Sequence, residues 1–275
     1  MAEHARREPT IGVICDGVGY GGDGSAWCGE ILIGDLLDYE RFARFRPLRL
    51  PGGDAAARET GRCALSWLVD VLGEEAADHP LAARVMPDAE RRSSVLALLA
   101  ADIRCPPSSG LGRLFDATAA LLGVCLLNHH EALSGMRLEA LAARSRERPS
   151  VDGLLPIESA AGAVCELDTR PLLEALLARS ASGADTGGSA WLFHAALADA
   201  LARAVALARE RTGIRTVGLS GGVFCNALLT ELLAGRLADD GCDVLIHREV
   251  PPTDGGLAYG QAAVAAARGA LRMEA

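Results

Sequence analysis

The chain has 275 residues, of which 50% are hydrophobic and only 4% aromatic, so it is long enough to bury a core built mainly from Ala, Leu and Val. Its formal net charge of −9 disfavours a nucleic-acid surface, because phosphate binding needs clustered Lys and Arg. No stretch approaches the roughly 20 apolar residues of a membrane span, and the charged opening MAEHARREPT does not fit a signal peptide. We therefore expect a cytoplasmic protein with no nucleic-acid or membrane partner.

Cysteines are scattered along the chain, eight in all, without a CxxC pair. This spacing disfavours both a zinc ribbon and a compact disulfide framework. We expect most of the cysteines to be buried and to pack as small hydrophobic side chains.

The first half of the chain predicts a β-hairpin followed by helices. Residues 11–15 and 27–33 are apolar runs on either side of a glycine-rich segment, a pattern typical of a hairpin with a long loop. The sequence PGGD at 51–54 predicts the start of a helix that runs to about residue 72. Prolines then break residues 81–107 into short helices.

The middle of the chain predicts two further helices. Ser108 and Ser109 can cap a helix over residues 111–122, and another helix covers residues 131–144. The charged, proline-ended sequence ARSRERPS at 143–150 then predicts a surface linker.

The C-terminal third alternates helices and strands most clearly. A helix over 189–211 ends at Gly213, before a strand at 216–219. A second helix opens with SGGVFCN and runs to about residue 237, a strand follows at 244–247, and PPTDGG opens the last helix. This repeated β-loop-α order predicts an α/β fold.

The sequence SGGVFCN, from Ser220 to Asn226, lies between a predicted strand and a predicted helix. Gly221 and Gly222 allow backbone N–H groups to approach an anion, and a helix start favours negative charge, so the motif predicts a phosphate or nucleotide loop. The alternative is a tight turn in which Asn226 makes a local polar contact. The motif matches neither the Walker loop nor the dinucleotide fingerprint.

Two carboxylates beside glycines are candidate metal ligands. Asp254 lies in PPTDGG, where it could organise a phosphate-bound Mg²⁺ or act as an N-cap. Asp16 ends the first predicted strand, where it could be a ligand or the first residue of an Asx turn. A shared site requires the two side chains to converge.

A third candidate lies at the start of the helix over 111–122. Gly112 could permit close approach of a ligand, and Asp116, one helical turn further on, could accept hydrogen bonds from ribose hydroxyls. The alternative is an ordinary helix in which Asp116 pairs with Arg113.

The histidines do not form a ligand set by spacing. His129 and His130 are adjacent and would point to different sides of a regular element, so they are not a helical metal pair. We expect a solvated helix start or a core imidazole there. No Ser/His/Asp or Cys/His set can be assembled from the spacing, so nucleophilic catalysis is not predicted and the catalytic residues remain unassigned.

Six blocks of sequence occur in order along nearly the whole chain: CDGVGYGGDGSAWCGE, LRLPGGDAAARE, GRLFDATAALLG, FHAALADALA, LSGGVFCN and VPPTDGGLAYGQAA. Together they resemble the C-terminal, TsaD-like domain of the hydrogenase maturation carbamoyltransferase family HypF. The resemblance implies an α/β, two-lobed ATPase-like fold of the sugar kinase, actin and heat-shock 70 type. Residues 1–108 would be the remainder of an incomplete first lobe, and residues 109–275 the second lobe with the nucleotide-binding loops.

The resemblance also implies an activity. In HypF a separate YrdC-like domain makes carbamoyl-adenylate from carbamoyl phosphate and ATP, and the C-terminal domain passes the carbamoyl group to the terminal cysteine of HypE. ATP or carbamoyl-adenylate, a divalent metal and a HypE-like acceptor protein are therefore expected. By this similarity Asp16 and Asp254 contact the metal. The residues that would hold the adenylate are Gly112, Asp116, Gly221, Gly222 and Asn226.

One departure from the family concerns the metal. In the family a helix with two metal-binding histidines lies just upstream of the block that opens here, whereas this sequence starts with MAEH. Full activity is therefore expected to need an upstream HypF fragment in trans. Two alternatives are an inactive nucleotide-binding or partner-docking remnant and a small-molecule O-carbamoyltransferase.

Overall fold

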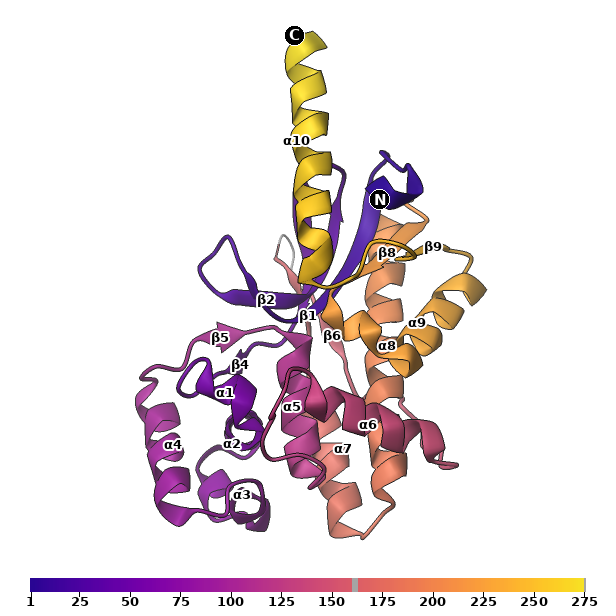
Figure 1. Ribbon diagram of the computed structural model, residues 1–275. Coiled ribbons are helices and arrows are strands. Elements are labelled where there is room, and N and C mark those ends of the chain that lie inside the picture. The colour runs from indigo at the N-terminus through magenta and orange to yellow at the C-terminus, as the bar shows by residue number, and fades with distance from the viewer. Residues whose placement is uncertain (160–162, 275) are drawn as a thin grey trace.

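A mixed β-sheet of nine strands runs through the molecule (Figure 1), in a computed structural model that describes residues 1–159 and 163–274. The strands are β1 (Thr10–Tyr20), β2 (Ala26–Gly34), β3 (Tyr39–Phe45), β4 (Leu48–Arg49), β5 (Pro107–Ser108), β6 (Ile157–Glu158), β7 (Cys165–Leu167), β8 (Thr216–Ser220) and β9 (Asp243–Ile246). They lie in the order β6-β7-β3-β2-β1-β8-β9, and β5 pairs with β2 and β4 beside this path.

The first and last strands of the chain belong to the same sheet. β1, β2 and β3 are antiparallel, whereas β8 lies parallel to β1, with Ile11 opposite Val217, and β9 lies parallel to β8. The sheet therefore crosses the predicted boundary between residues 1–108 and 109–275, and the division into lobes stays a prediction. Residues 160–162 and 275 of the second range lie outside the described residues.

The predicted hairpin is confirmed, but the expected long glycine-rich loop is wrong. β1 continues to Tyr20 and β2 begins at Ala26, so only a short turn separates them. A register shift between Cys15 and Gly19 keeps the strands paired past the glycines. A Cβ atom at Gly19 would lie 2.4 Å from Cys28 Sγ, so a larger residue there would force the Cys28 side chain to move.

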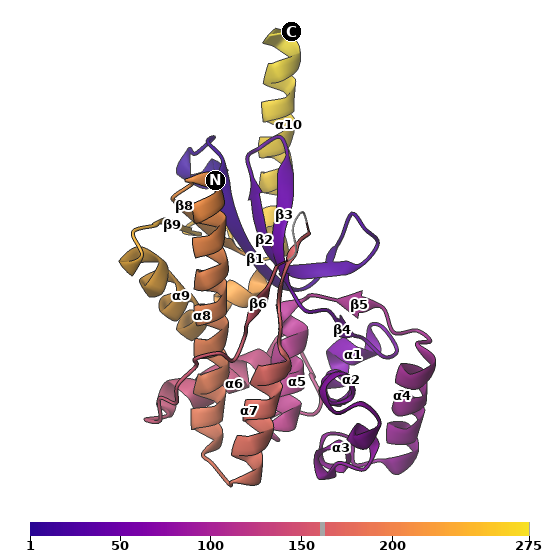
Figure 2. The same cartoon turned by 180° about the vertical axis from the view of Figure 1, so that it is seen from behind.

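Helices α1 to α7 gather at one end of the sheet, while α10 points toward the opposite end and projects beyond the strands (Figures 1 and 2). The α-helices are α1 (Ala55–Arg58), α2 (Thr60–Leu72), α3 (Pro80–Val85), α4 (Ala89–Ala101), α5 (Leu111–Leu121), α6 (Leu133–Arg144), α7 (Arg170–Ala181), α8 (Thr186–Thr212), α9 (Ala227–Asp239) and α10 (Leu257–Glu274). Four 3-10 turns are η1 (Ala2–His4), η2 (Gly73–Ala77), η3 (Gly222–Cys225) and η4 (Asp254–Gly256).

The predicted helices are present, with two differences. The helix expected over 51–72 is broken at Glu59, whose φ of −98° and ψ of 87° separate α1 from α2. SGGVFCN forms the 3-10 turn η3, and α9 begins only at Ala227. β3 and α7 had no counterpart in the sequence predictions.

The cysteines behave as predicted. All eight are free thiols, and five of them are buried. Among the others, Cys225 is exposed in η3.

α8 is the central helix of the core and packs against β1 and β2 (Figure 2). Leu197, Leu201 and Val205 on this helix are at most 1% exposed. Asp185 caps the helix start, because its carboxylate accepts a hydrogen bond from Gly188 N–H at 2.7 Å. α8 is long and apolar enough to cross a membrane by length and composition alone. Most of its apolar stretch is buried inside the protein, however, as in the core helix of a globular protein.

A buried histidine on α8 connects this helix to the start of α9. His194 is 0% exposed, and burial lowers the pKa of its imidazole to about 4. Its Nδ1 lies 2.7 Å from Ala190 O and its Nε2 lies 2.9 Å from Asn226 Nδ2. With the ring proton on Nδ1, the neutral imidazole donates to the carbonyl and accepts from the amide. The Asn226 Oδ1 then accepts a hydrogen bond from Leu229 N–H at 2.9 Å, which caps α9.

This histidine makes the free energy of unfolding depend on pH. Its pKa is lower in the folded state than in the unfolded state, so the unfolded chain binds the proton first as the pH falls. The free energy of unfolding should therefore fall between about pH 6.5 and about pH 4, with His194 contributing about 2 kcal/mol of the loss by about pH 5. Urea unfolding at several pH values measures this, and His194→Gln should flatten the dependence. An equally steep dependence in His194→Gln, or flattening by the exposed control His130→Gln, would contradict the assignment.

Candidate functional site

A cavity of about 1170 Å³ is lined by residues from β1, α5, α6, η3 and the start of η4. The predicted site residues that line it are Asp16, Gly112, Asp116, Gly222, Asn226 and Asp254. Gly221 directly precedes Gly222 in the chain. The loops that the sequence singled out, which are distant along the chain, therefore meet around one cavity.

Asp16 joins the first strand to the glycine turn after β8. Its Oδ2 accepts a hydrogen bond from Gly222 N–H at 2.9 Å, and its Oδ1 accepts one from Gly17 N–H at 2.7 Å. β1 and β8 are parallel, so their carboxyl ends lie at the same edge of the sheet. The Asx-turn alternative for Asp16 is replaced by this long-range contact.

Gly221 makes a second contact that only glycine permits. Its φ is 106°, and a Cβ atom there would lie 2.1 Å from Cys15 O. Its N–H donates to Pro252 O at 3.0 Å, which ties the turn to the segment that carries Asp254. The first strand, the glycine turn and the PPTDGG segment are thus held together by backbone contacts.

The start of α9 is already bound to a carboxylate of the protein. Glu139 Oε1 on α6 accepts hydrogen bonds from Ala227 N–H at 2.7 Å and from Leu228 N–H at 3.3 Å. Asn226 caps the same helix and contacts His194, so the alternative of a local polar contact is confirmed for this residue. An incoming phosphate would therefore meet η3 rather than the N-terminal amides of α9.

Gly112 allows α5 to approach the end of β1. A Cβ atom at this position would lie 2.8 Å from Gly17 Cα. The close neighbour that requires a glycine is thus the backbone of Gly17, and Gly112 also faces the cavity.

Asp116 lines the cavity and is 2% exposed. Its Oδ1 accepts hydrogen bonds from Asn128 Nδ2 at 2.8 Å and from Ser134 Oγ, and its Oδ2 lies 3.0 Å from Arg113 Nη1. Burial raises the pKa of this carboxyl, while Arg113, Ser134 and Asn128 oppose that rise. The alternative in which Asp116 pairs with Arg113 is confirmed, and a ribose contact stays a prediction.

The pair between Arg113 and Asp116 is close but poorly aligned. Within the described residues, neither Arg113 Nη1 nor Asp116 Oδ2 has a hydrogen-bond partner, although the two atoms are 3.0 Å apart. Buried polar atoms of this kind are usually hydrogen-bonded in proteins. Both atoms are themselves buried, so their charges are balanced by this ion pair.

Asp254 is exposed and is the first residue of η4. The N-cap of η4 is Thr253, so the N-cap alternative for Asp254 is wrong. Burial, together with the charges of Asp16, Glu30 and Asp254, raises the pKa of the Cys28 thiol to about 12. Asp16 and Asp254 thus act electrostatically on the same group.

Acidic side chains outnumber basic ones around the cavity. The acidic ones are Asp16, Asp54, Asp116, Glu131, Glu139 and Asp254, and the basic ones are Arg58 and Arg113. A nucleotide polyanion would be repelled by such a lining unless a cation accompanied it. The residues therefore fit a nucleotide bound together with a divalent metal.

The ligand set for that metal is small. Asp16 and Asp254 supply two carboxylates, and Asp16 already accepts two backbone hydrogen bonds. The described part of the chain contains no group of three or more His, Cys, Asp or Glu side chains that could hold a metal ion. His129 and His130 line the cavity from an exposed loop. Ligands besides the two carboxylates would have to come from the nucleotide, from water or from another polypeptide.

Sequence reasoning missed three residues that shape the site. Glu139 occupies the start of α9, and Asn128 and Ser134 hold Asp116. These contacts join segments that carry no recognisable motif, so no local pattern indicates them. Arg113 was identified, because its spacing of three residues from Asp116 is visible in the sequence.

Known proteins resemble this chain over most of its length. Residues 12–261 match the family model described as carbamoyltransferase, Kae1-like domain, second subdomain. The chain is 42% identical over 274 residues to the carbamoyltransferase HypF homolog of Cupriavidus necator, covering 97% of this chain and 67% of that protein. It is 39% identical to carbamoyltransferase HypF of Rhodobacter capsulatus, covering 93% of this chain and 32% of that protein.

Solved structures agree with these matches. A crystal structure of full-length HypF in the phosphate- and nucleotide-bound form matches with a TM-score of 0.87 and 32% identity, covering 96% of this chain and 40% of that one. The crystal structure of T. kodakarensis HypF matches with a TM-score of 0.83 and 31% identity, covering 96% and 35%. The chain thus spans well under half of these longer HypF proteins. The predicted α/β fold and family resemblance are confirmed, and the chain belongs to the HypF carbamoyltransferase family, in which it matches the second subdomain of the Kae1-like domain.

Proposed function

We propose that this chain passes a carbamoyl group from carbamoyl-adenylate to the C-terminal cysteine thiolate of a HypE-like acceptor protein in the cytoplasm. The observation that carries this proposal is the convergence of Asp16, the Gly221–Gly222 turn and Asp254 on one cavity large enough for a nucleotide. Family membership supports the reaction class. A related full-length HypF was solved with phosphate and nucleotide bound.

The reaction needs orientation and charge stabilisation rather than a nucleophile from this chain. The acceptor thiolate would attack the carbamoyl carbon, a carbon–sulfur bond would form, and the bond from that carbon to the adenylate oxygen would break as AMP leaves. A divalent metal would supply positive charge against the phosphate. Asp16 and Asp254 would hold that metal, and η3 would shape the pocket around the phosphate. Arg113 and Asp116 would line the part of the cavity that receives the adenylate.

A second candidate is a nucleotide-binding or partner-docking module without activity of its own. The small metal-ligand set in the described residues favours it, because two carboxylates alone bind a divalent metal weakly. Under this alternative the cavity would still bind nucleotide. The two candidates therefore differ in carbamoyl transfer and not in nucleotide affinity.

Removing either proposed metal ligand should weaken nucleotide binding. Asp16→Asn and Asp254→Asn should each lower the affinity for ATP with Mg²⁺ by about tenfold or more, a change of about 1.4 kcal/mol, because the metal that neutralises the phosphates is lost. Isothermal titration calorimetry measures this, with Asp54→Asn as a control that changes another carboxylate lining the same cavity. Equal affinities in all variants would contradict the assignment of the ligands.

Carbamoyl transfer should require the acceptor thiol. The chain is mixed with carbamoyl-adenylate, produced from carbamoyl phosphate and ATP by a YrdC-like protein, and with a HypE-like acceptor. Mass spectrometry of the acceptor should show one carbamoyl group on its terminal cysteine, with more product when a histidine-bearing upstream HypF fragment is added in trans. Replacing that cysteine by serine should abolish the product.

Two results of this assay would redirect the assignment. Nucleotide binding without transfer under any of these conditions would identify the inactive module. Transfer to small-molecule hydroxyl groups, but not to the protein thiol, would identify an O-carbamoyltransferase.

A further inference from the structure

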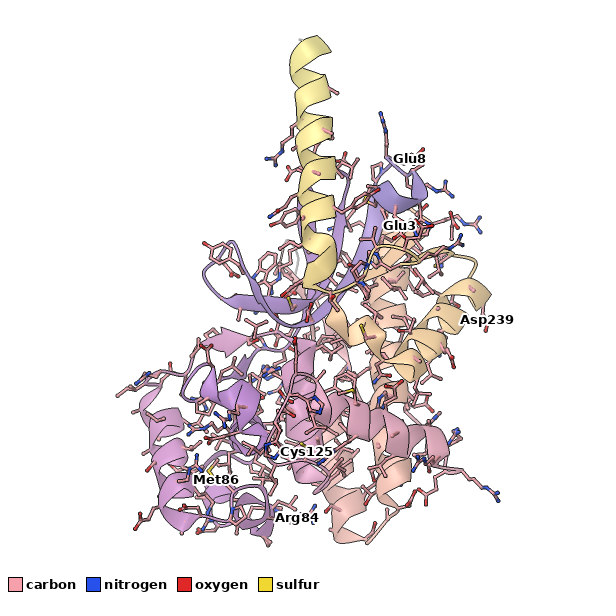
Figure 3. All side chains as sticks on the ribbon, in the orientation of Figure 1. Glu3, Glu8, Arg84, Met86, Cys125 and Asp239 are labelled. Atoms are coloured by element: carbon pink, nitrogen blue, oxygen red, sulfur yellow. The ribbon has the colours of Figure 1, made fainter. Side chains whose placement is uncertain are left out.

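The N-terminal turn η1 lies beside the segment that connects β9 to η4 (Figure 3 labels Glu3 there). The carboxylate of Glu3 is the centre of this contact. Its Oε1 accepts hydrogen bonds from three consecutive backbone N–H groups, at 2.9 Å from Arg248, 2.7 Å from Glu249 and 3.4 Å from Val250. The side chain of Glu3 is 13% exposed. One carboxylate therefore binds the backbone of the connecting segment as an anion binds a concave set of amides.

A histidine extends this contact to the end of β8. His247 Nδ1 lies 3.2 Å from Glu3 Oε2, and His247 Nε2 lies 3.0 Å from Ser220 Oγ. Ser220 immediately precedes the Gly221–Gly222 turn. A second cavity, of about 300 Å³, is lined by Glu3, His247 and Ser220 among others. Among the residues that the structure describes, it shares no lining residue with the larger cavity of the candidate site.

The segment that Glu3 binds leads directly into the nucleotide cavity. Two residues after Val250, Pro252 O accepts the hydrogen bond from Gly221 N–H, and Asp254 follows on the cavity wall. Asp254 itself is exposed in a short 3-10 turn, so its position depends on how the preceding segment is held. Hydrogen bonds from the backbone of Glu249, Arg248 and Val250 and from His247 lower the pKa of Glu3 to about 2, so the carboxylate is ionised at neutral pH.

We propose that Glu3 is a positioning residue that fixes residues 247–256 and thereby directs Asp254 into the nucleotide cavity. The role of Asp254 in this proposal rests on the proposed function, whereas the anchoring of the segment does not. Charge-assisted hydrogen bonds are about twice as strong as neutral ones, and three of them converge on one side chain. Neutralising Glu3 should therefore weaken the hydrogen bonds of residues 248–250 without removing any side chain from the hydrophobic core.

Hydrogen exchange of the full chain tests the anchoring directly. Glu3→Gln should increase the exchange rate of the amides of residues 248–250 by about tenfold, because the charged acceptor is lost. Glu3→Asp keeps the charge and should restore part of the protection. Glu8→Gln is the matched control, since Glu8 lies on the same N-terminal segment but accepts a local hydrogen bond from Arg7 N–H (Figure 3). Unchanged exchange in Glu3→Gln, or an equal increase in Glu8→Gln, would overturn the proposal.

A double-mutant cycle tests the connection to Asp254. Glu3→Gln should weaken binding of ATP with Mg²⁺ about fivefold in the wild-type background and should have no further effect in Asp254→Asn, because both changes act through one carboxylate. A loss of the same size in both backgrounds would show that Glu3 acts through general stability and would overturn its positioning role. If the wild-type chain binds no nucleotide, the proposed function fails, and the exchange measurement alone decides whether Glu3 anchors the segment.

Discussion

The site depends on the hydrogen bond that the carboxylate of Asp16 accepts from the glycine turn after β8. The carboxylate accepts the N–H of Gly222 across a separation of 206 residues in the sequence, and the parallel pairing of β1 with β8 brings the two residues together. Gly221 lets the turn pass within contact distance of Cys15 O, and Gly112 does the same for α5 beside Gly17. Without these close approaches the walls of the cavity would separate. Close backbone approaches at the glycines therefore bring the walls of the cavity together, and side chains such as Asp16 add hydrogen bonds between them.

Carboxylates bind backbone amides at three points around this region. Asp16 holds the glycine turn, Glu139 holds the start of α9, and Glu3 holds the segment before Asp254. Each one occupies a set of amides that could otherwise attract an anion. Acidic side chains outnumber basic ones around the cavity, so it suits a nucleotide only when a cation accompanies it. The proposed activity would therefore depend on the supply of that cation.

Much of the fold could be predicted because its elements have strong local patterns. The apolar periodicity of α8 and the glycine-flanked ends of β1 and β8 are visible in the sequence, and so are the candidate ligands Asp16 and Asp254. β3 was not predicted, because its sequence YERFARF mixes charged and aromatic residues without the regular alternation that indicates a half-buried strand. The glycine-rich segment after Cys15 was interpreted as a loop, since a bulge that keeps strands paired depends on the partner strand.

The remaining features of the site depend on distant contacts. Asp116 looked equally suited to a ribose or to Arg113, and only the positions of Asn128 and Ser134 show how its carboxylate is held. The contact of Glu3 with Glu249 joins the two ends of the sequence and has no local pattern at all. Resemblance to a known family supplied the roles that spacing left open, and the geometry shows which of those residues share one cavity.

Substitution of Gly222 tests the central claim most directly. Its φ is not in the left-handed region, so alanine can keep the backbone conformation, but the added Cβ would lie 3.1 Å from Asp16 Oδ1, and the carboxylate would have to shift by a few tenths of an ångström from its hydrogen bond with the turn. Calorimetric titration of ATP with Mg²⁺ into Gly222→Ala, with thermal unfolding to verify the fold, should show an affinity at least about tenfold lower than that of the wild type. An unchanged affinity in a folded variant would contradict the account, because the turn and Asp16 would then not belong to the nucleotide site.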